Sequence, residues 1–103
     1  MTEDTQMIIV LGSVRGSADT FDELLEASLA HVRRSRTEPG CLEHGVHRDV
    51  QDPLRLVFVE RWQDRQALDR HFAVPGSVAF VAAVRRLAAG PPTLTVHEVA
   101  APA

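Results

Sequence analysis

The chain has 103 residues, the size of one small domain, and 45% of them are hydrophobic while 24% are charged. The formal net charge is −3 without a basic stripe, which argues against nucleic acid as a partner. The only cysteine, Cys41, excludes a disulfide within the chain, and the apolar runs are too short for a membrane span. The polar start, MTEDTQ, lacks a secretory pattern, so a cytoplasmic location is expected.

A strand and a helix are predicted first. Residues 1–6 are expected to be a flexible tail, and Met7–Leu11 is a short β-branched run typical of a strand. A Gly/Ser loop is expected over residues 12–17. Asp19 or Thr20 then caps a helix that runs to about Arg36. The helix is predicted because apolar residues recur on one stripe: Phe21, Leu24, Leu25, Leu29 and Val32.

Two strands are predicted next. Glu38-Pro39-Gly40 ends the helix and turns the chain. Leu42–Arg48 indicates a polar strand, and residues 49–53 indicate a turn. Leu54–Trp62 is the clearest strand in the sequence.

The last elements are a broken helix and a strand. Asp64 is predicted to cap a short helix, which Pro75-Gly76 interrupts, and a further helix then ends at Gly90-Pro91-Pro92. The final strand is Thr93–Val99, and residues 100–103 are expected to be a tail. Residues 7–99 therefore form one predicted domain.

The element order is β-α-β-β-α-β, which predicts a ferredoxin-like α+β fold with an antiparallel sheet and helices on one face. The first and third strands lie in the middle of such a sheet, and both are apolar on two faces. Helices cover only one face, so a second copy of the chain is predicted to cover the other, sheet against sheet. If the face that carries Phe58 is the open one, Phe58→Asp breaks that dimer.

Several short motifs carry a family resemblance over residues 7–99. They are Glu38-Pro39-Gly40-Cys41-Leu42, Val59-Glu60-Arg61-Trp62, and Ala67 to Phe72 (ALDRHF), followed by Pro75 and Phe80. In this order and spacing they resemble the antibiotic biosynthesis monooxygenase family, especially its small quinol-monooxygenase-like members.

The resemblance implies a dimeric α+β barrel. It also implies oxygen insertion into quinol-like or polycyclic aromatic substrates with dioxygen and with no flavin, haem or metal cofactor. In that chemistry the deprotonated substrate gives an electron to dioxygen, and the protein takes the proton and excludes water.

The sequence departs from relatives at two places. A haem-degrading branch of the same fold uses an Asn on its first strand, but Met7–Leu11 contains none, which argues against haem degradation. Tyrosine is common in the pockets of relatives, whereas this chain has no Tyr and carries His44 where one is common.

Six residues are the predicted site. His71 is a general base or a polar anchor for a phenolic hydroxyl, or else a structural histidine that closes its helix. Trp62 is a stacking wall or a core aromatic. His44 is a second polar contact, and three aromatic residues shape the pocket: Phe58, Phe72 and Phe80.

Other residues with reactive side chains are predicted to have structural roles. Glu60, if buried, is expected to pair with Arg48 on the neighbouring strand. Cys41 is predicted to be a small apolar residue rather than a nucleophile. No metal site is predicted, because His44 and His47 point to opposite faces, and neither His31 nor His97 has a partner at ligand spacing.

Two functions stay open from the sequence. The first is a cofactor-independent monooxygenase that acts on a small aromatic substrate. The alternative is a binding module of the same dimeric fold, which holds a small molecule and performs no chemistry.

Overall fold

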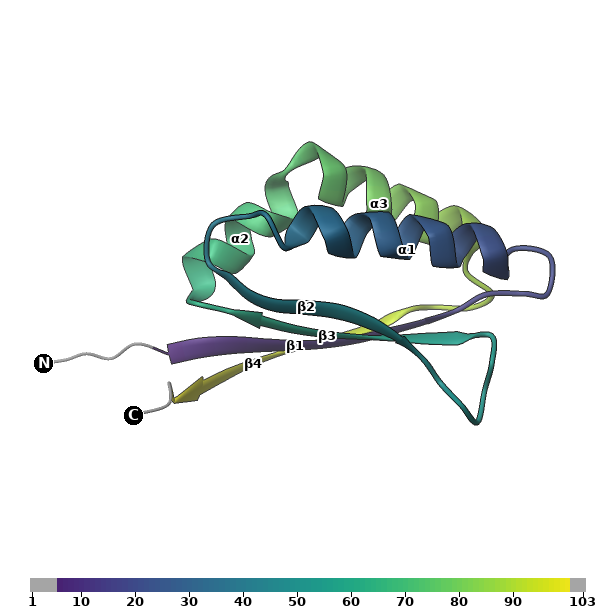
Figure 1. Ribbon diagram of the computed structural model, residues 1–103, viewed down its shortest axis with the longest axis horizontal. Helices are drawn as coiled ribbons and strands as arrows, with labels where there is room; N and C mark the ends of the chain where they lie inside the picture. Colours follow the sequence, from purple (N-terminus) through teal and green to yellow (C-terminus); the bar gives the residue numbers. More distant parts are fainter. Residues whose placement is uncertain (1–5, 101–103) are drawn as a thin grey trace, which may run out of the picture.

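The computed structural model describes residues 6–100, so the predictions for residues 1–5 and 101–103 lie outside the described residues. Its elements, labelled in Figure 1, are β1 Gln6–Arg15, α1 Phe21–Ser35, β2 Cys41–Arg48, β3 Arg55–Trp62, α2 Arg65–Ala73, α3 Pro75–Leu87 and β4 Thr93–Ala100. Gln6 and Ala100, predicted to lie in the tails, belong to strands.

The predicted ferredoxin-like α+β fold is confirmed. The four strands form one antiparallel sheet in the order β2-β3-β1-β4, so the two strands that are apolar on both faces lie in the middle, as predicted. All three helices lie on the same side of the sheet (Figure 1). In the described part of the chain, no helix is long and apolar enough to cross a membrane.

The first strand is longer than the sequence indicated. The loop predicted over residues 12–17 is wrong for its first four residues, since β1 continues to Arg15. Gly12 pairs with Phe58 on one side and Leu94 on the other. A Cβ on Gly12 would lie 3.3 Å from the Thr93 carbonyl oxygen, so glycine here permits close strand packing.

The two faces of β3 have opposite roles. Leu56, Phe58 and Trp62 are buried beneath the helices, whereas Val57 and Val59 are half-buried on the other face. The Phe58 face is therefore not the open one, and Phe58→Asp does not test the predicted dimer. The alternation of β3 defines the two faces, but only the helix positions decide which of them is covered.

An irregularity in β2 changes the alternation of its side chains between the two faces of the sheet. The register with β3 shifts between Cys41 and Glu43, so Leu42 is an extra residue at a β-bulge. Leu42 is 51% exposed while His44 is 2% exposed. Regular strand alternation places residues 42 and 44 on one face, but the bulge resets the alternation and separates them.

Side-chain capping explains where α2 begins, but not where α1 begins. Asp64 caps α2 as predicted, and its carboxylate accepts a hydrogen bond from the Ala67 amide at 2.8 Å. Thr20 occupies the N-cap position of α1, but its hydroxyl donates to the Leu87 carbonyl at 2.8 Å instead of capping the helix. The predicted break between the last two helices falls at Val74, and Pro75 begins α3.

The core consists of two apolar clusters with polar residues between them. Leu56 and Phe58 belong to one cluster, and Trp62 belongs to the other. Glu60 lies between them on the same face of β3 and is 5% exposed. The polar residues buried here, in the middle of the helix-covered face, form the candidate site.

Candidate functional site

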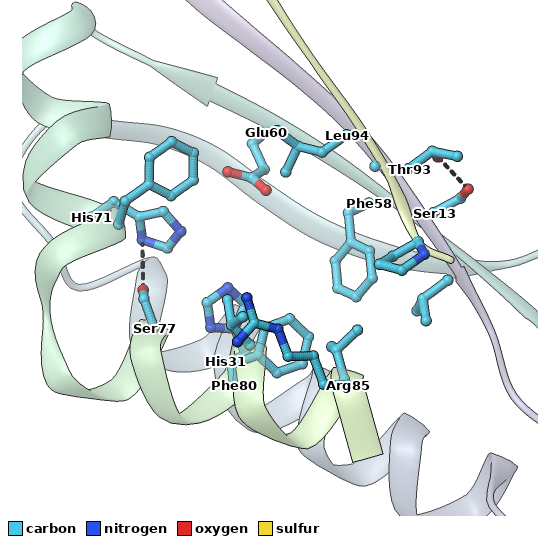
Figure 2. A pocket seen from close by; sticks show the side chains of 16 residues that line it. Ser13, His31, Phe58, Glu60, His71, Ser77, Phe80, Arg85, Thr93 and Leu94 are labelled. Atoms are coloured by element: carbon cyan, nitrogen blue, oxygen red, sulfur yellow. Dashed lines mark hydrogen bonds between the residues drawn. The ribbon is translucent and has the colours of Figure 1, made fainter. Parts of the chain in front are cut away.

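A cavity of about 290 Å³ opens between the covered face of the sheet and helices α2 and α3. Its walls are mainly apolar, and aromatic rings line both sides (Figure 2). The residues used below that line it are Phe58, Phe72, Phe80, His31, His71 and Glu60. A cavity of this size and character suits a small, flat, apolar molecule.

His71 lines the cavity and is held by two neighbours. Its Nδ1 lies 2.9 Å from a carboxylate oxygen of Glu38 and 3.5 Å from the hydroxyl of Ser77. A carboxylate only accepts, so Nδ1 carries the proton and Nε2 keeps its lone pair. Figure 2 shows the second ring nitrogen of His71 on the cavity side. The side chain is therefore oriented to accept a proton from a bound molecule.

The surroundings keep His71 neutral. Burial lowers its pKa below the ordinary histidine value, and the nearby carboxylates Glu38 and Glu60 oppose that shift without cancelling it. The imidazole is thus a base, not a cation, at neutral pH. Trp62 packs against this ring with centroids 4.5 Å apart.

His31 comes from α1 and lines the same cavity. Its ring stacks on Phe80, with centroids 4.0 Å apart and planes 10° from parallel. Arg34 donates from Nη2 to its Nδ1 at 2.7 Å, so the proton of this ring is on Nε2. Burial, together with the neighbouring His44, Arg34 and His71, lowers the pKa of His31 to about 3.

Glu60 lines the cavity and also contacts Trp62 and His44, which lie behind the cavity wall. Its Oε1 accepts a hydrogen bond from Trp62 Nε1 at 2.9 Å and lies 3.4 Å from Nε2 of His44. Burial raises the pKa of Glu60, but the contacts with His44 and Trp62 outweigh it and hold the pKa below its usual value. The predicted partner Arg48 is wrong, because its Nε donates to the Pro53 carbonyl instead.

Three histidines meet between the sheet and the helices. The ring centroids of His31, His44 and His71 are 5.2 to 5.4 Å apart in every pair. One ring nitrogen from each lies within 4.8 Å of the others, and all three side chains are buried. The expectation that His31 lacks a partner is therefore wrong, because α1 packs over β2 and α2 lies beside it, which brings the three histidines together.

The structure separates the six predicted site residues into two groups. Phe58, His71, Phe72 and Phe80 line the cavity. His44 and Trp62 are buried behind its wall, against His71, with ring centroids 5.4 and 4.5 Å from that ring. Trp62 also belongs to the second apolar cluster.

Sequence analysis missed four polar residues of the site. Glu38 was assigned only to a turn, and neither Arg34 nor Ser77 was assigned to the site, although all three contact the histidines. His31 lies seven residues after Leu24, on the buried face of α1, and this spacing was a usable signal. Cys41 is half-buried, and burial raises the pKa of its thiol, which disfavours a nucleophilic role.

Comparisons with known proteins point to one family. The sequence profile of the antibiotic biosynthesis monooxygenases matches residues 7–83. An uncharacterized protein of Synechocystis sp., sll1783, is 31% identical over 93 residues, which cover 90% of this chain and 63% of that protein. The chain therefore spans less than two thirds of the length of that relative.

Two further relatives extend the likeness. YcnE of Bacillus subtilis is 25% identical over 85 residues, covering 82% of this chain and 90% of that protein. A crystal structure from Deinococcus radiodurans, which bears the family's name, matches with a TM-score of 0.88 at 25% identity. That match covers 93% of this chain and 95% of the other.

Proposed function

The chain belongs to the antibiotic biosynthesis monooxygenase family, and from this premise we propose that it oxidises a quinol-like or polycyclic aromatic substrate with dioxygen, without a cofactor. The observation that carries the proposal is the neutral His71, whose Nε2 faces an aromatic-walled cavity while Glu38 fixes its Nδ1 proton. A base held in this way, in a cavity with mainly apolar walls, suits the abstraction of a phenolic proton.

The proposed reaction needs little from the protein beyond a base and a dry site. His71 takes the proton of a substrate hydroxyl, and the resulting electron-rich ring passes an electron to dioxygen. Oxygen then adds to a ring carbon, and one of its two atoms stays there. The other leaves as water, so a quinol and O₂ give a hydroxyquinone and H₂O.

The remaining predicted residues have supporting roles in this proposal. Phe58, Phe72 and Phe80 hold the flat substrate by ring contacts. Trp62 is a positioning residue, because it packs against His71 and donates a hydrogen bond to Glu60. His44 contacts the histidines from behind the wall and fixes their arrangement.

The proposal includes a homodimer. The face of the sheet away from the helices carries Ile9, Leu11, Val57 and Val59 on its two central strands, and Leu11 is 44% exposed. Soluble proteins rarely leave such a central apolar surface in water. A second copy, packed sheet against sheet, is the proposed cover.

Oxygen uptake tests the enzymatic proposal directly. Chelator-treated protein is mixed with a panel of quinols and anthrones, and uptake is compared with the autoxidation blank. We expect catalysed uptake that added chelator does not change. His71→Ala is expected to reduce it by roughly 10²- to 10⁴-fold, the range for loss of a general base.

The matched control is His97→Ala, which removes a histidine of the edge strand β4 that does not line the cavity. It is expected to keep the uptake of the unaltered protein. Unchanged uptake in His71→Ala would remove His71 from the mechanism. Binding of panel compounds without any uptake would instead support the binding module.

A further inference from the structure

His44 is an unusual buried residue. It is 2% exposed, yet neither of its ring nitrogens has a hydrogen-bond partner within residues 6–100. Glu60 Oε1 is the near neighbour of Nε2, at 3.4 Å, without the geometry of a hydrogen bond. Buried polar groups are nearly always paired, so a core imidazole whose Nδ1 has no partner, and whose Nε2 has only the long contact with Glu60, points to a further ligand.

The surroundings of His44 supply the other ligands of a metal site. Nitrogens of His31, His44 and His71 already lie within 4.8 Å of one another. Around a tetrahedral ion with Zn–N bonds of about 2.1 Å, ligand nitrogens are about 3.4 Å apart. Binding therefore requires side-chain rotations that bring these nitrogens closer together by up to about 1.4 Å.

Two carboxylates contact the histidines of the proposed metal site. Glu38 accepts from Nδ1 of His71, and Glu60 lies beside Nε2 of His44. A carboxylate behind a ligating histidine orients the ring and makes it a better ligand. Both glutamates are largely buried, with side chains 13% and 7% exposed, so a dication would also offset their charge.

Arg34 opposes binding at His31. Its Nη2 donates to Nδ1 of that ring, which leaves the Nε2 proton in place. A metal at Nε2 requires the proton to be on Nδ1, so Arg34 must release the ring. The guanidinium has other acceptors nearby, because Ser77 Oγ lies 3.2 Å from Nη2 and Glu38 Oε2 lies 3.6 Å from Nε.

From this geometry we infer that His31, His44 and His71 form a binding site for one divalent transition-metal ion of the Zn²⁺ type. Three imidazoles suit zinc and its neighbours in the first transition series. His31 and His71 also line the cavity, so an ion that they bind lies at the cavity wall, where a molecule in the cavity can supply a fourth ligand. Three protein ligands with one open position is the arrangement of catalytic rather than structural zinc sites.

This inference goes beyond the proposed function. A metal on Nε2 of His71 uses the lone pair that the proposed base needs, so the metal-bound and proton-accepting forms exclude each other. Added Zn²⁺ is therefore expected to inhibit any oxygen uptake. The two proposals fail separately, because metal binding is measured without substrate and uptake is measured with chelator.

Titration with Co²⁺, a spectroscopic substitute for Zn²⁺, tests the site. Metal-free protein is expected to bind one ion per chain and to develop the intense visible bands of four- or five-coordinate Co²⁺, which Zn²⁺ then removes. Zn²⁺ is also expected to raise the melting temperature. Folded protein that gives only the weak bands of octahedral Co²⁺ would overturn the inference.

Variants connect the binding to these three residues. His44→Gln is expected to weaken Co²⁺ binding at least tenfold, while His47→Gln, the same change on an exposed position of β2, leaves it unchanged. Arg34→Gln keeps all three histidines and removes the competing donor, so it is expected to strengthen binding. This last variant keeps the test valid if His44→Gln does not fold. Equal weakening by His44→Gln and His47→Gln, or weaker binding by Arg34→Gln, would contradict the site.

Discussion

Neighbouring side chains give the histidines of the site different protonation patterns. Glu38 accepts from Nδ1 of His71, so its Nε2 is a base, whereas Arg34 donates to Nδ1 of His31, so its Nε2 is a donor. The two rings are 5.2 Å apart, centroid to centroid. Two neighbouring histidines that line one cavity thus carry opposite tautomers, each fixed by a different charged side chain.

The low pKa of His31 predicts a pH-dependent stability. Its folded-state pKa is about 3, whereas an unfolded histidine titrates near 6.5. Between these values the unfolded chain binds the extra proton, so the free energy of unfolding falls as the pH falls. The slope from one such group is about 1.4 kcal/mol per pH unit. Lowering the pH from 7 to 5 therefore removes about 2 kcal/mol through His31.

Urea unfolding at the two pH values measures this loss. In His31→Gln the loss is expected to be smaller by about 2 kcal/mol, although burial also lowers the pKa of His71 and leaves part of the effect. His97→Gln, which removes an exposed histidine, should lose as much stability as the unaltered chain. Equal losses in His31→Gln and the unaltered chain would contradict the assignment.

At the scale of elements, the turn between α1 and β2 positions the site. Glu38 lies in this turn and reaches His71 on α2, while Gly40 has φ of +83° and carries the chain into β2. The Gly40 carbonyl accepts from the Gln63 amide at 2.8 Å, which fixes the turn to the end of β3. The Glu-Pro-Gly motif therefore serves both the fold and the orientation of His71.

Gly40→Ala is expected to destabilise the protein by about 1–3 kcal/mol, because the left-handed backbone is strained for alanine. The new Cβ would also lie 2.5 Å from the Ala67 Cβ on α2. The comparison variant is Gly90→Ala, at φ of +115°, where a Cβ meets no described atom within 4 Å. Urea unfolding should show the larger loss at Gly40; a larger loss at Gly90 would show that the contact with α2 is unimportant.

At the scale of the whole molecule, the helices cover one face of the sheet and leave the other for the proposed dimer (Figure 1). Val59, on β3, pairs with Leu11 of β1 and Gly45 of β2 across the centre of that open face. Its position makes it a better test of the interface than Phe58, which lies under the helices.

Val59→Lys is expected to convert the dimer to a monomer, because it places a charge in the middle of the apolar contact. Light scattering measures the mass in solution. Val78→Lys is the control, since Val78 is 60% exposed on α3, on the helix side of the molecule. A dimer that survives Val59→Lys in folded protein would place the interface elsewhere.

The sequence by itself determined the order and type of the elements, the antiparallel sheet and the family resemblance. These predictions rest on local signals, which depend only on residues close together in the sequence. The signals are the strand and helix periodicities, the Asp64 cap and the Pro and Gly breaks. The end of β1 and the bulge at Leu42 could not be predicted from the sequence. Pairing with neighbouring strands extends β1 to Arg15 and creates the bulge, and composition does not reveal that pairing.

Only the tertiary structure decided which residues meet. Glu38 and His71 are 33 positions apart, and His31, His44 and His71 come from α1, β2 and α2. The periodicity of a single helix or strand cannot show that residues of different elements are neighbours. In the sequence, a polar residue on a buried helix face appears only as an interruption of the apolar stripe. Their proximity follows from the packing of three elements over one sheet face, which also determines that Phe58 lines the cavity and Val59 does not.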